Sequence, residues 1–77
     1  MSNFSEDLEN LREDLKDELM AINNYQRHID GTDNHDIQTA LGHIRDEEKE
    51  HFAELVKLIR SLDPTEDEKF IKEEQED

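Results

Sequence analysis

Two glutamates and one histidine are the residues of this sequence that could bind a metal ion together. Glu48 and His51 are three residues apart, so both side chains would lie on one face of a helix, and Glu18 comes thirty residues before Glu48. Carboxylate oxygens with one imidazole suit Fe²⁺, Mn²⁺ or Zn²⁺. Because there is no cysteine, thiolate sites are excluded and any metal must be held by oxygen and imidazole nitrogen.

Apolar residues at helical spacing surround these polar residues and predict two long helices, over about 5–30 and 35–62. The first stripe consists of Phe4, Leu8, Leu11, Leu15, Glu18, Ile22, Tyr25 and Ile29. The second consists of Ile37, Leu41, Ile44, Glu48, His51, Leu55, Leu58 and Leu62. Only the metal-ligand candidates interrupt the apolar run in the middle of each stripe, so we expect them at core positions.

Turn-forming residues mark where these helices begin and end. The segment 31–35 is short and rich in turn formers, which predicts a tight connection and an antiparallel hairpin. Asp63, Pro64 and Glu66 have the pattern of an N-cap, a first helical residue and a capping box, and so predict a short third helix over about 64–74. Ser5 is the candidate N-cap of the first helix, with Ser2 as the alternative. We therefore predict one all-α domain over 1–77, an antiparallel two-helix hairpin plus a short C-terminal helix.

In an antiparallel hairpin, Glu18 and Glu48 face each other, because each lies fifteen residues from Asp33. Both would lie about 22 Å from the turn, at 1.5 Å per residue. A carboxylate in a packed seam is costly unless it is paired, protonated or bound to a cation. Two hairpins related by a twofold axis would form a four-helix bundle with the ligand set of ferritin-like di-iron proteins. Its four carboxylates would then balance two divalent ions.

The composition narrows the function classes further. The net charge of −14 would repel nucleic acids and anionic membranes. The N-terminus has no signal-peptide pattern, and no apolar run approaches the about 20 residues of a membrane span, so we expect a cytoplasmic protein. The regular stripes argue against the disorder that the high charge alone could indicate.

With these features the sequence resembles the encapsulated ferritins, small ferritin-like proteins that are housed inside encapsulin shells. The resemblance covers about residues 8–66 and is carried by the segments 17–25 (DELMAINNY), 44–55 (IRDEEKEHFAEL) and 62–65 (LDPT). It implies a half-bundle that dimerises around a ferroxidase centre, with five such dimers forming a decamer. The implied activity is oxidation of Fe²⁺ by oxygen, with Fe³⁺ delivered into the shell for mineralisation.

The resemblance also implies roles for individual residues. Glu18 and His51 match terminal iron ligands, Glu48 matches the carboxylate that bridges two irons per dimer interface, and Tyr25 matches a tyrosine beside the centre. Zn²⁺, Mn²⁺ or Ca²⁺ could take the place of iron in crystals. Asp17 and Glu47 are candidates for the auxiliary metal-uptake site of the family.

The sequence departs from some relatives near this auxiliary site and at its end. Asn24 stands where some relatives have a tryptophan, and Met20 stands where they have an acidic residue. The apolar peptide with which relatives dock on the shell is not found after Glu73.

Simpler interpretations remain for the same residues. Glu18 could lie on a rotated, solvated helix face, Glu48 and His51 could form a hydrogen-bonded core pair, and Tyr25 could serve packing alone. The flanking Glu47, Glu50 and Glu54 would form a solvated face or attract Fe²⁺, and His28, His35 and His43 are expected in solvent. Two rival functions are a non-enzymatic helical oligomerisation module, in which polar seam residues specify register, and a rubrerythrin-like peroxide reductase.

Overall fold

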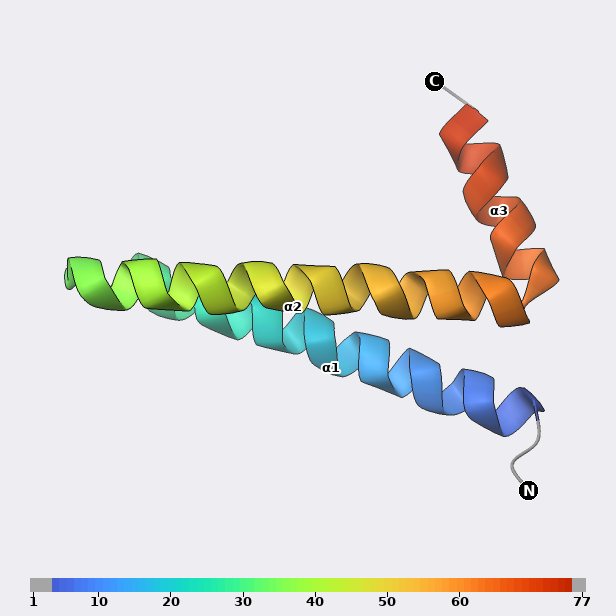
Figure 1. The fold of residues 1–77 in the computed structure, drawn as a ribbon, viewed down its shortest axis with the longest axis horizontal. Helices are drawn as coiled ribbons and strands as arrows, with labels where there is room; N and C mark the ends of the chain where they lie inside the picture. Colours follow the sequence, from blue (N-terminus) through green and yellow to red (C-terminus); the bar gives the residue numbers. More distant parts are fainter. Residues whose placement is uncertain (1–3, 76–77) are drawn as a thin grey trace.

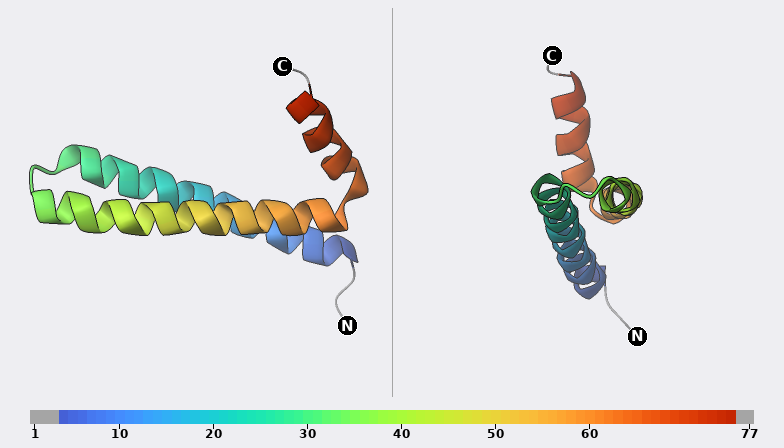
Figure 2. Two further views of the ribbon diagram at one scale, coloured as in Figure 1. Left: turned by 45° about the horizontal axis from the view of Figure 1, so that its top comes forward. Right: turned by 90° about the vertical axis from the view of Figure 1, so that its left-hand side faces the viewer.

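The computed structural model describes residues 4–75, which form three helices. These are α1 (Phe4–Gly31), α2 (His35–Leu62) and α3 (Pro64–Gln75). The helices α1 and α2 lie antiparallel and side by side, and α3 leaves the end of α2 at a steep angle (Figures 1 and 2). The predicted all-α hairpin with a short C-terminal helix is therefore confirmed.

A three-residue loop, 32–34, joins the two long helices. The Asn34 side chain caps α2 by accepting a hydrogen bond from the backbone N–H of Ile37, over 3.1 Å. Across the loop, the Gln38 amide donates to the carbonyl oxygen of Thr32, over 2.8 Å. These bonds satisfy the N–H of Ile37 in the first turn of α2 and the carbonyl of Thr32 just after α1. They therefore stabilise the short turn that sets α2 against α1.

Asp63 forms the corner between α2 and α3. Its Oδ1 accepts hydrogen bonds from the backbone N–H groups of Thr65 and Glu66, over 3.1 and 3.2 Å, which confirms the predicted N-cap. The return bond of a capping box is absent at this corner, because the N–H of Asp63 donates to the carbonyl of Ile59 and so closes the last turn of α2. The Glu66 carboxylate lies instead 3.5 Å from the Arg12 guanidinium on α1.

Two arginines attach α3 to the hairpin. Arg12 on α1 donates to Asp63 over 2.9 Å, and Arg60 on α2 donates to Asp67 over 2.7 Å and pairs with Glu74 at 3.5 Å. The hydrogen bond that Arg60 donates to Asp67 is the largest cause of a pKa for Arg60 above its usual value. The direction of α3 is thus held by ion pairs.

The expected cap of α1 is wrong. Ser5 already lies inside α1, which begins at Phe4, so its backbone is helical and it cannot be the N-cap. The alternative cap, Ser2, lies outside the described residues.

The apolar contact between α1 and α2 is thin. Among the described residues, only Leu8 and Ile59 are buried apolar side chains, with 6% and 2% of their surface exposed. Both lie toward the open end of the hairpin. Nearer the loop, a polar contact joins the helices, because Arg45 donates to Gln26 over 2.8 Å.

The second predicted stripe is only partly turned toward α1. Four of its members are exposed, namely Ile37, Ile44, His51 and Leu58. Partly buried residues one position later, including Gln38, Arg45 and Phe52, belong to the face that meets α1. The sequence predicts that the whole stripe lies in the core. In a two-helix hairpin, however, α2 packs along one long neighbour, α1, which is too narrow to cover so broad a face.

The chain is a single layer of helices. Its Cα radius of gyration is 15.9 Å. A compact domain of this length would have a value of about 11.5 Å. Along its shortest axis the structure measures only 14 Å. None of the helices in the described range is long and apolar enough to span a membrane.

We predict that Ile59→Ala lowers the free energy of unfolding of the metal-free chain by about 2 to 4 kcal/mol, because it empties the most buried position. The measurement is urea denaturation followed by circular dichroism. The control is Met20→Ala, which removes a comparable but exposed side chain and should change stability by less than about 0.5 kcal/mol. Equal losses in both variants would show that Ile59 is not the centre of the core.

Candidate metal centre

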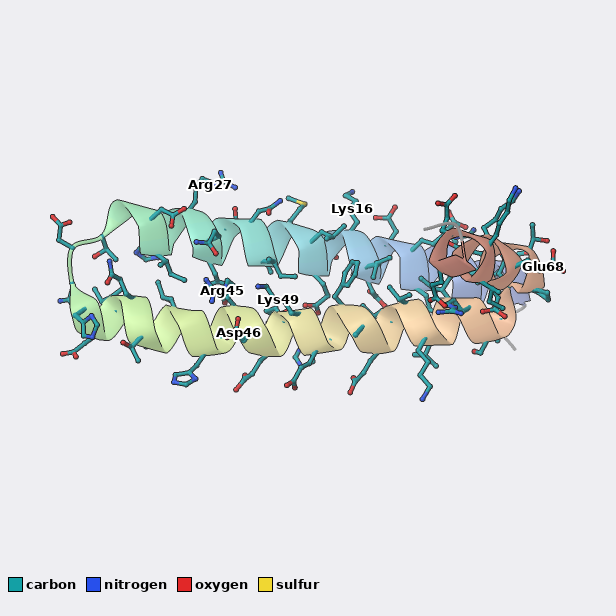
Figure 3. The ribbon with its side chains drawn as sticks, turned by 90° about the horizontal axis from the view of Figure 1, so that it is seen from above. Lys16, Arg27, Arg45, Asp46, Lys49 and Glu68 are labelled. Carbon is teal, nitrogen blue, oxygen red and sulfur yellow. The ribbon has the colours of Figure 1, made fainter. Side chains whose placement is uncertain are left out.

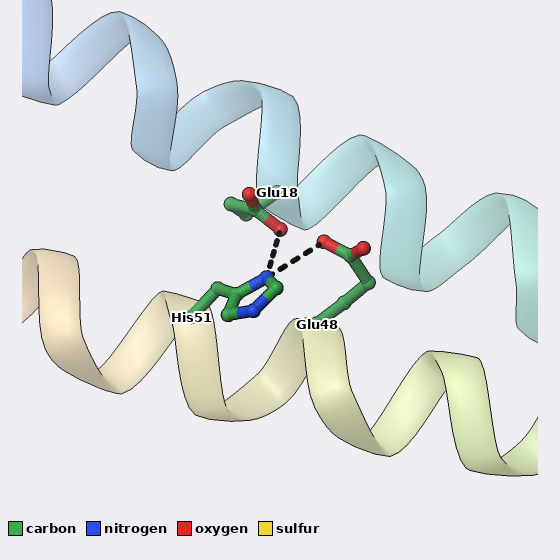
Figure 4. Close-up of side chains that lie close together, drawn as sticks. All are labelled: Glu18, Glu48 and His51. Atoms are coloured by element: carbon green, nitrogen blue, oxygen red, sulfur yellow. Dashed lines mark ion pairs between the residues drawn. The ribbon is translucent and has the colours of Figure 1, made fainter.

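The structure brings together the three residues singled out as metal ligands. Glu18 extends from the middle of α1, and Glu48 and His51 extend from the middle of α2 (Figure 4). One donor atom of each lies within 4.8 Å of the other two. The Nδ1 atom of His51 lies 3.6 Å from Glu48 Oε2 and 3.9 Å from Glu18 Oε2.

The short loop and the helical repeat produce this meeting. Because the loop 32–34 is centred on Asp33, Glu18 and Glu48 lie at equal heights on antiparallel helices. His51 follows Glu48 by three residues, nearly one helical turn, and therefore projects from the same side of α2. The spacing of Glu18, Glu48 and His51 along the chain therefore brings them close together between the two helices.

The distances suit a shared ion better than direct hydrogen bonds. Separations of 3.6 and 3.9 Å exceed the range of an N–H···O hydrogen bond. Bonds from iron-like divalent ions to oxygen and nitrogen are about 2.0 to 2.2 Å, which puts neighbouring ligand atoms roughly 2.8 to 3.6 Å apart. The separation of His51 from Glu48 is at the upper end of this range, and its separation from Glu18 is slightly wider.

Burial gives a second sign that a cation fits here. The Oε2 atom of Glu18 is buried and has no hydrogen-bond partner in the part of the chain that the structure describes, and its nearest cationic group is His51 at 3.9 Å. The side chains of Glu18 and Glu48 are 24% and 21% exposed, whereas that of His51 is 54% exposed. A buried carboxylate oxygen without a partner is unfavourable, and a bound cation would remove that cost.

A groove of about 370 Å³ opens beside the cluster. Its lining contains four acidic residues, one histidine and two leucines, namely Asp14, Asp17, Glu18, Glu54, His51, Leu55 and Leu58. Its acids give a negative path from solvent to the ligands.

Asp14 was not predicted from the sequence, and Glu54 was predicted only as one of the acidic residues that flank the seam. The spacing of both residues from the candidate ligands would have identified them. Asp14 precedes Glu18 by four residues and Glu54 follows His51 by three, so each shares a face with a ligand.

The other predicted residues lie outside the cluster. Asp17 lines the groove, but Glu47 is exposed and does not. Tyr25, seven residues from Glu18 on the same stripe, is partly buried and belongs to neither the cluster nor the groove lining. The three remaining histidines are exposed as predicted: His28, His35 and His43.

The cluster lies on an unpaired apolar face of the hairpin. Ile37, Ile44, His51 and Leu58 recur every seven residues, and all four are exposed on α2. We call these four residues the exposed row. A seven-residue apolar repeat is the pattern with which helices pack against each other. The three candidate ligands and this exposed seven-residue repeat therefore share His51 and one side of the hairpin.

A helical hairpin that presents two carboxylates and an imidazole at mid-height is a scaffold for a metal centre between helices. The chain belongs to the EncFtn-like family, whose family model matches residues 1–74. It is an encapsulated ferritin-like protein, as the resemblance predicted.

Two relatives come from Myxococcus xanthus (strain DK1622). Over 54 residues the chain is 50% identical to the encapsulin nanocompartment cargo protein EncC, and over 67 residues it is 33% identical to the cargo protein EncB. These alignments cover 70% and 87% of this chain but 42% of each relative. The chain thus spans less than half the length of the curated relatives that it matches. No solved structure matches it.

We predict that the chain binds Zn²⁺, used as a redox-inert probe, and that Glu48→Gln weakens binding at least about tenfold, the effect of losing about 1.4 kcal/mol. The glutamine keeps the shape of the side chain but loses its charge. Glu47→Gln is the matched control, because Glu47 is exposed and outside the cluster. Isothermal titration calorimetry measures both, and equal affinities of the two variants would contradict the assignment.

Proposed function

We propose that this chain is a ferroxidase that oxidises Fe²⁺ to Fe³⁺ at a di-iron site shared by two copies. The observation that carries the proposal is the buried, unpartnered Glu18 oxygen inside a cluster of two carboxylates and one imidazole. Membership of the EncFtn-like family supports iron as the metal. Iron is here the substrate, and dioxygen is the proposed oxidant.

One hairpin supplies too few ligands for two ions, which is why we infer a dimer. The cluster offers three residues, and His51 is part of the exposed row, so a second hairpin packed on that row would bring its own three ligands close. Each chain contributes two carboxylates, which match the charge of one divalent ion. Such a dimer would bury Ile37, Ile44 and Leu58. A decamer of five dimers is the larger assembly that the family resemblance implies.

Each residue then has a defined task. Glu18 and His51 would each act as a terminal ligand, and Glu48 would be the carboxylate shared by the two ions. Two ions held side by side can each give one electron to the same oxygen molecule. Tyr25 is proposed to lie beside the completed centre.

The groove supports a route for the substrate. Asp14, Asp17 and Glu54 would draw Fe²⁺ toward the ligands, an attraction that salt should weaken. Asp17, which lines the groove, keeps its proposed place at an auxiliary uptake site. Because the relatives are named as encapsulin cargo, we further propose that this chain works inside an encapsulin compartment in the cytoplasm and supplies Fe³⁺ for storage.

We predict that the chain accelerates aerobic Fe²⁺ oxidation, and that Glu48→Gln reduces the rate to that of Fe²⁺ in buffer. Absorbance of Fe³⁺ species measures the rate. Glu47→Gln should keep the activity of the unmodified chain. An unchanged rate in Glu48→Gln would refute the ferroxidase, and faster turnover with peroxide than with oxygen would favour a peroxide reductase.

We also predict that metal and the exposed row act together in forming the dimer. Zn²⁺ should shift the chain from monomer to dimer, because four carboxylates otherwise crowd one core. Leu58→Glu should prevent this shift by placing a charge in the apolar row. Leu19→Glu, at an exposed apolar position on α1, is the control and should still dimerise. Sedimentation velocity measures both variants, and a wild-type chain that stays monomeric with metal contradicts the shared site.

One observation favours the alternative of a helical oligomerisation module, namely the exposed row itself, which could join copies without metal. That alternative predicts a dimer of full strength in metal-free buffer and no oxidation activity. The two measurements above therefore separate the alternatives.

A further inference from the structure

Arg45 carries a positive charge in the seam between α1 and α2, outside both the metal cluster and the groove lining. It precedes the candidate ligand Glu48 by three residues, nearly one helical turn, and so extends from the same broad face of α2. In Figure 3 it lies between the two helices. Its side chain is 22% exposed, whereas that of Lys49, just after Glu48, is 57% exposed. A charge held this far out of water needs partners that compensate for its lost hydration.

The guanidinium of Arg45 has such partners on both helices. Its Nη1 donates to Gln26 Oε1 on α1 over 2.8 Å, and its Nε donates to Asp46 Oδ1 on α2 over 3.2 Å. The amide nitrogen of Gln26 donates to Asp30 Oδ1 over 2.9 Å, which leaves the amide oxygen for Arg45. Side chains thus connect α2 to α1 without a break, in the order Asp46, Arg45, Gln26, Asp30. We call these four residues the seam brace.

The seam brace crosses between the helices diagonally. Arg45 is twelve residues from Asp33 and Gln26 is seven, so their Cα atoms differ in height by about 7.5 Å at 1.5 Å per residue. Side chains on a helix lean toward its N-terminus, so Arg45 leans toward the loop and Gln26 leans away from it. The two side chains therefore meet although their helix positions are not level. A diagonal contact changes length when α2 slides along α1 or turns about its axis, so it opposes both motions.

The middle of the hairpin needs such a contact because its apolar packing is thin. The two buried apolar side chains, Leu8 and Ile59, lie toward the open end, and the cap of α2 lies at the loop. Between these ends, Glu18 and Glu48 repel each other unless a cation lies between them. The seam brace lies in the same stretch, one helical turn from Glu48.

The seam brace is also compatible with the proposed dimer. Arg45 follows Ile44 of the exposed row by one residue, which rotates its side chain by about 100° around α2. Ile44 is exposed, whereas Arg45 and Gln26 are partly buried between the helices of one chain. A second copy that packs on the exposed row would therefore leave the brace in place.

We infer that Arg45 is a positioning residue for the metal centre, which keeps Glu48 level with Glu18 by bracing α2 against α1. Arg45 does not touch the ion and acts only through the height and rotation of α2. A slide of α2 by one residue, about 1.5 Å, is large beside metal–ligand bonds of about 2.0 to 2.2 Å, so it would separate ligands that come from two helices. The inference rests on the proposed function, because it takes this cluster as the metal site.

The first test is calorimetric titration of the full chain with Zn²⁺. Arg45→Met removes the guanidinium and keeps an unbranched stem, and it should weaken binding about tenfold, the lower end of the effect of residues that support metal ligands. Gln26→Met should weaken binding by a similar factor. The double variant should lose no more than either single variant, because all three remove one contact. Additive losses would show that Arg45 and Gln26 do not act together and would overturn the brace.

Arg27→Met is the matched control for this titration. Arg27 is exposed and projects from α1 on the side away from α2 (Figure 3). The substitution removes the same charge and the same group from the chain, so Arg27→Met should bind Zn²⁺ as the wild type does. A loss equal to that of Arg45→Met would assign the effect to overall charge and overturn the positioning role.

A spectrum separates positioning from a general loss of stability. At saturating Co²⁺, the visible absorption of the ion reports its coordination geometry. This spectrum should differ from that of the wild type in Arg45→Met and return toward it in Arg45→Lys, which keeps a charged donor, with helix content by circular dichroism unchanged in both. A role in stability alone predicts the wild-type spectrum in Arg45→Met once Co²⁺ is saturating, and that result would overturn the inference.

Glu48→Gln distinguishes failure of this inference from failure of the proposed function. If Glu48→Gln loses Zn²⁺ binding and Arg45→Met binds as the wild type does, the metal site stands and the positioning role of Arg45 is overturned. If Glu48→Gln itself binds as the wild type does, the metal site is contradicted and this inference fails with it.

Discussion

The unfavourable position of two carboxylates in the seam of a thin hairpin is the constraint on which the rest of this structure depends. Glu18 and Glu48 occupy positions that an apolar residue would fill in an ordinary helix pair, and one oxygen of Glu18 has no hydrogen-bond partner among the described residues. A two-helix layer cannot bury such groups completely, because each helix has solvent on its outer sides. The carboxylates are therefore partly dehydrated, close together and accessible. Under these conditions, binding a divalent ion stabilises the carboxylates more than hydration by water does.

The same thinness explains why so much apolar surface remains exposed. The described residues include only two well-buried apolar side chains, and the radius of gyration is far above that of a compact domain, so the hairpin resembles a component of a larger core. The helix caps lie in the loop and at the corner, and the ion pairs of Arg12 and Arg60 also lie at the corner. There, caps and ion pairs determine where the helices start, stop and point. The candidate ligands in the middle of the hairpin and the exposed row along α2 remain accessible to other contacts.

Much of the fold could be predicted from the sequence, because its signals are local. Turn formers at 31–35 and the cap at Asp63 mark the ends of helices, and equal spacing from Asp33 brings Glu18 level with Glu48. The rotation of α2 could not be predicted in this way. Its stripe is wide enough to serve two neighbours, and periodicity alone does not say which of them belongs to the same chain. That is why Ile44 and Leu58 are exposed and Ile59 is buried.

The candidate site followed the same pattern. Its three candidate ligands could be singled out because the apolar stripes are interrupted in the middle only there. Asp14 was not singled out, and Glu54 was predicted only as part of a flanking acidic face, because both are surrounded by other acidic residues in the sequence. The ion pairs that direct α3 connect residues such as Arg12 and Asp63, which are far apart in the chain. No short-range pattern predicts contacts of that kind.

The three-residue loop fixes which residues of α1 and α2 lie at the same height. Two residues lie level when their numbers sum to the same total, so the height of the site is set by counting outward from Asp33 along both arms. Adding one residue to a single arm would move one ligand by about 1.5 Å and rotate it by about 100°. Adding seven to both arms would lift the whole cluster by about 10.5 Å with nearly the same facing. Length changes between Glu18 and Glu48 are thus tolerated only in matched pairs, whereas sequence beyond the two arms can vary in length without disturbing the ligands.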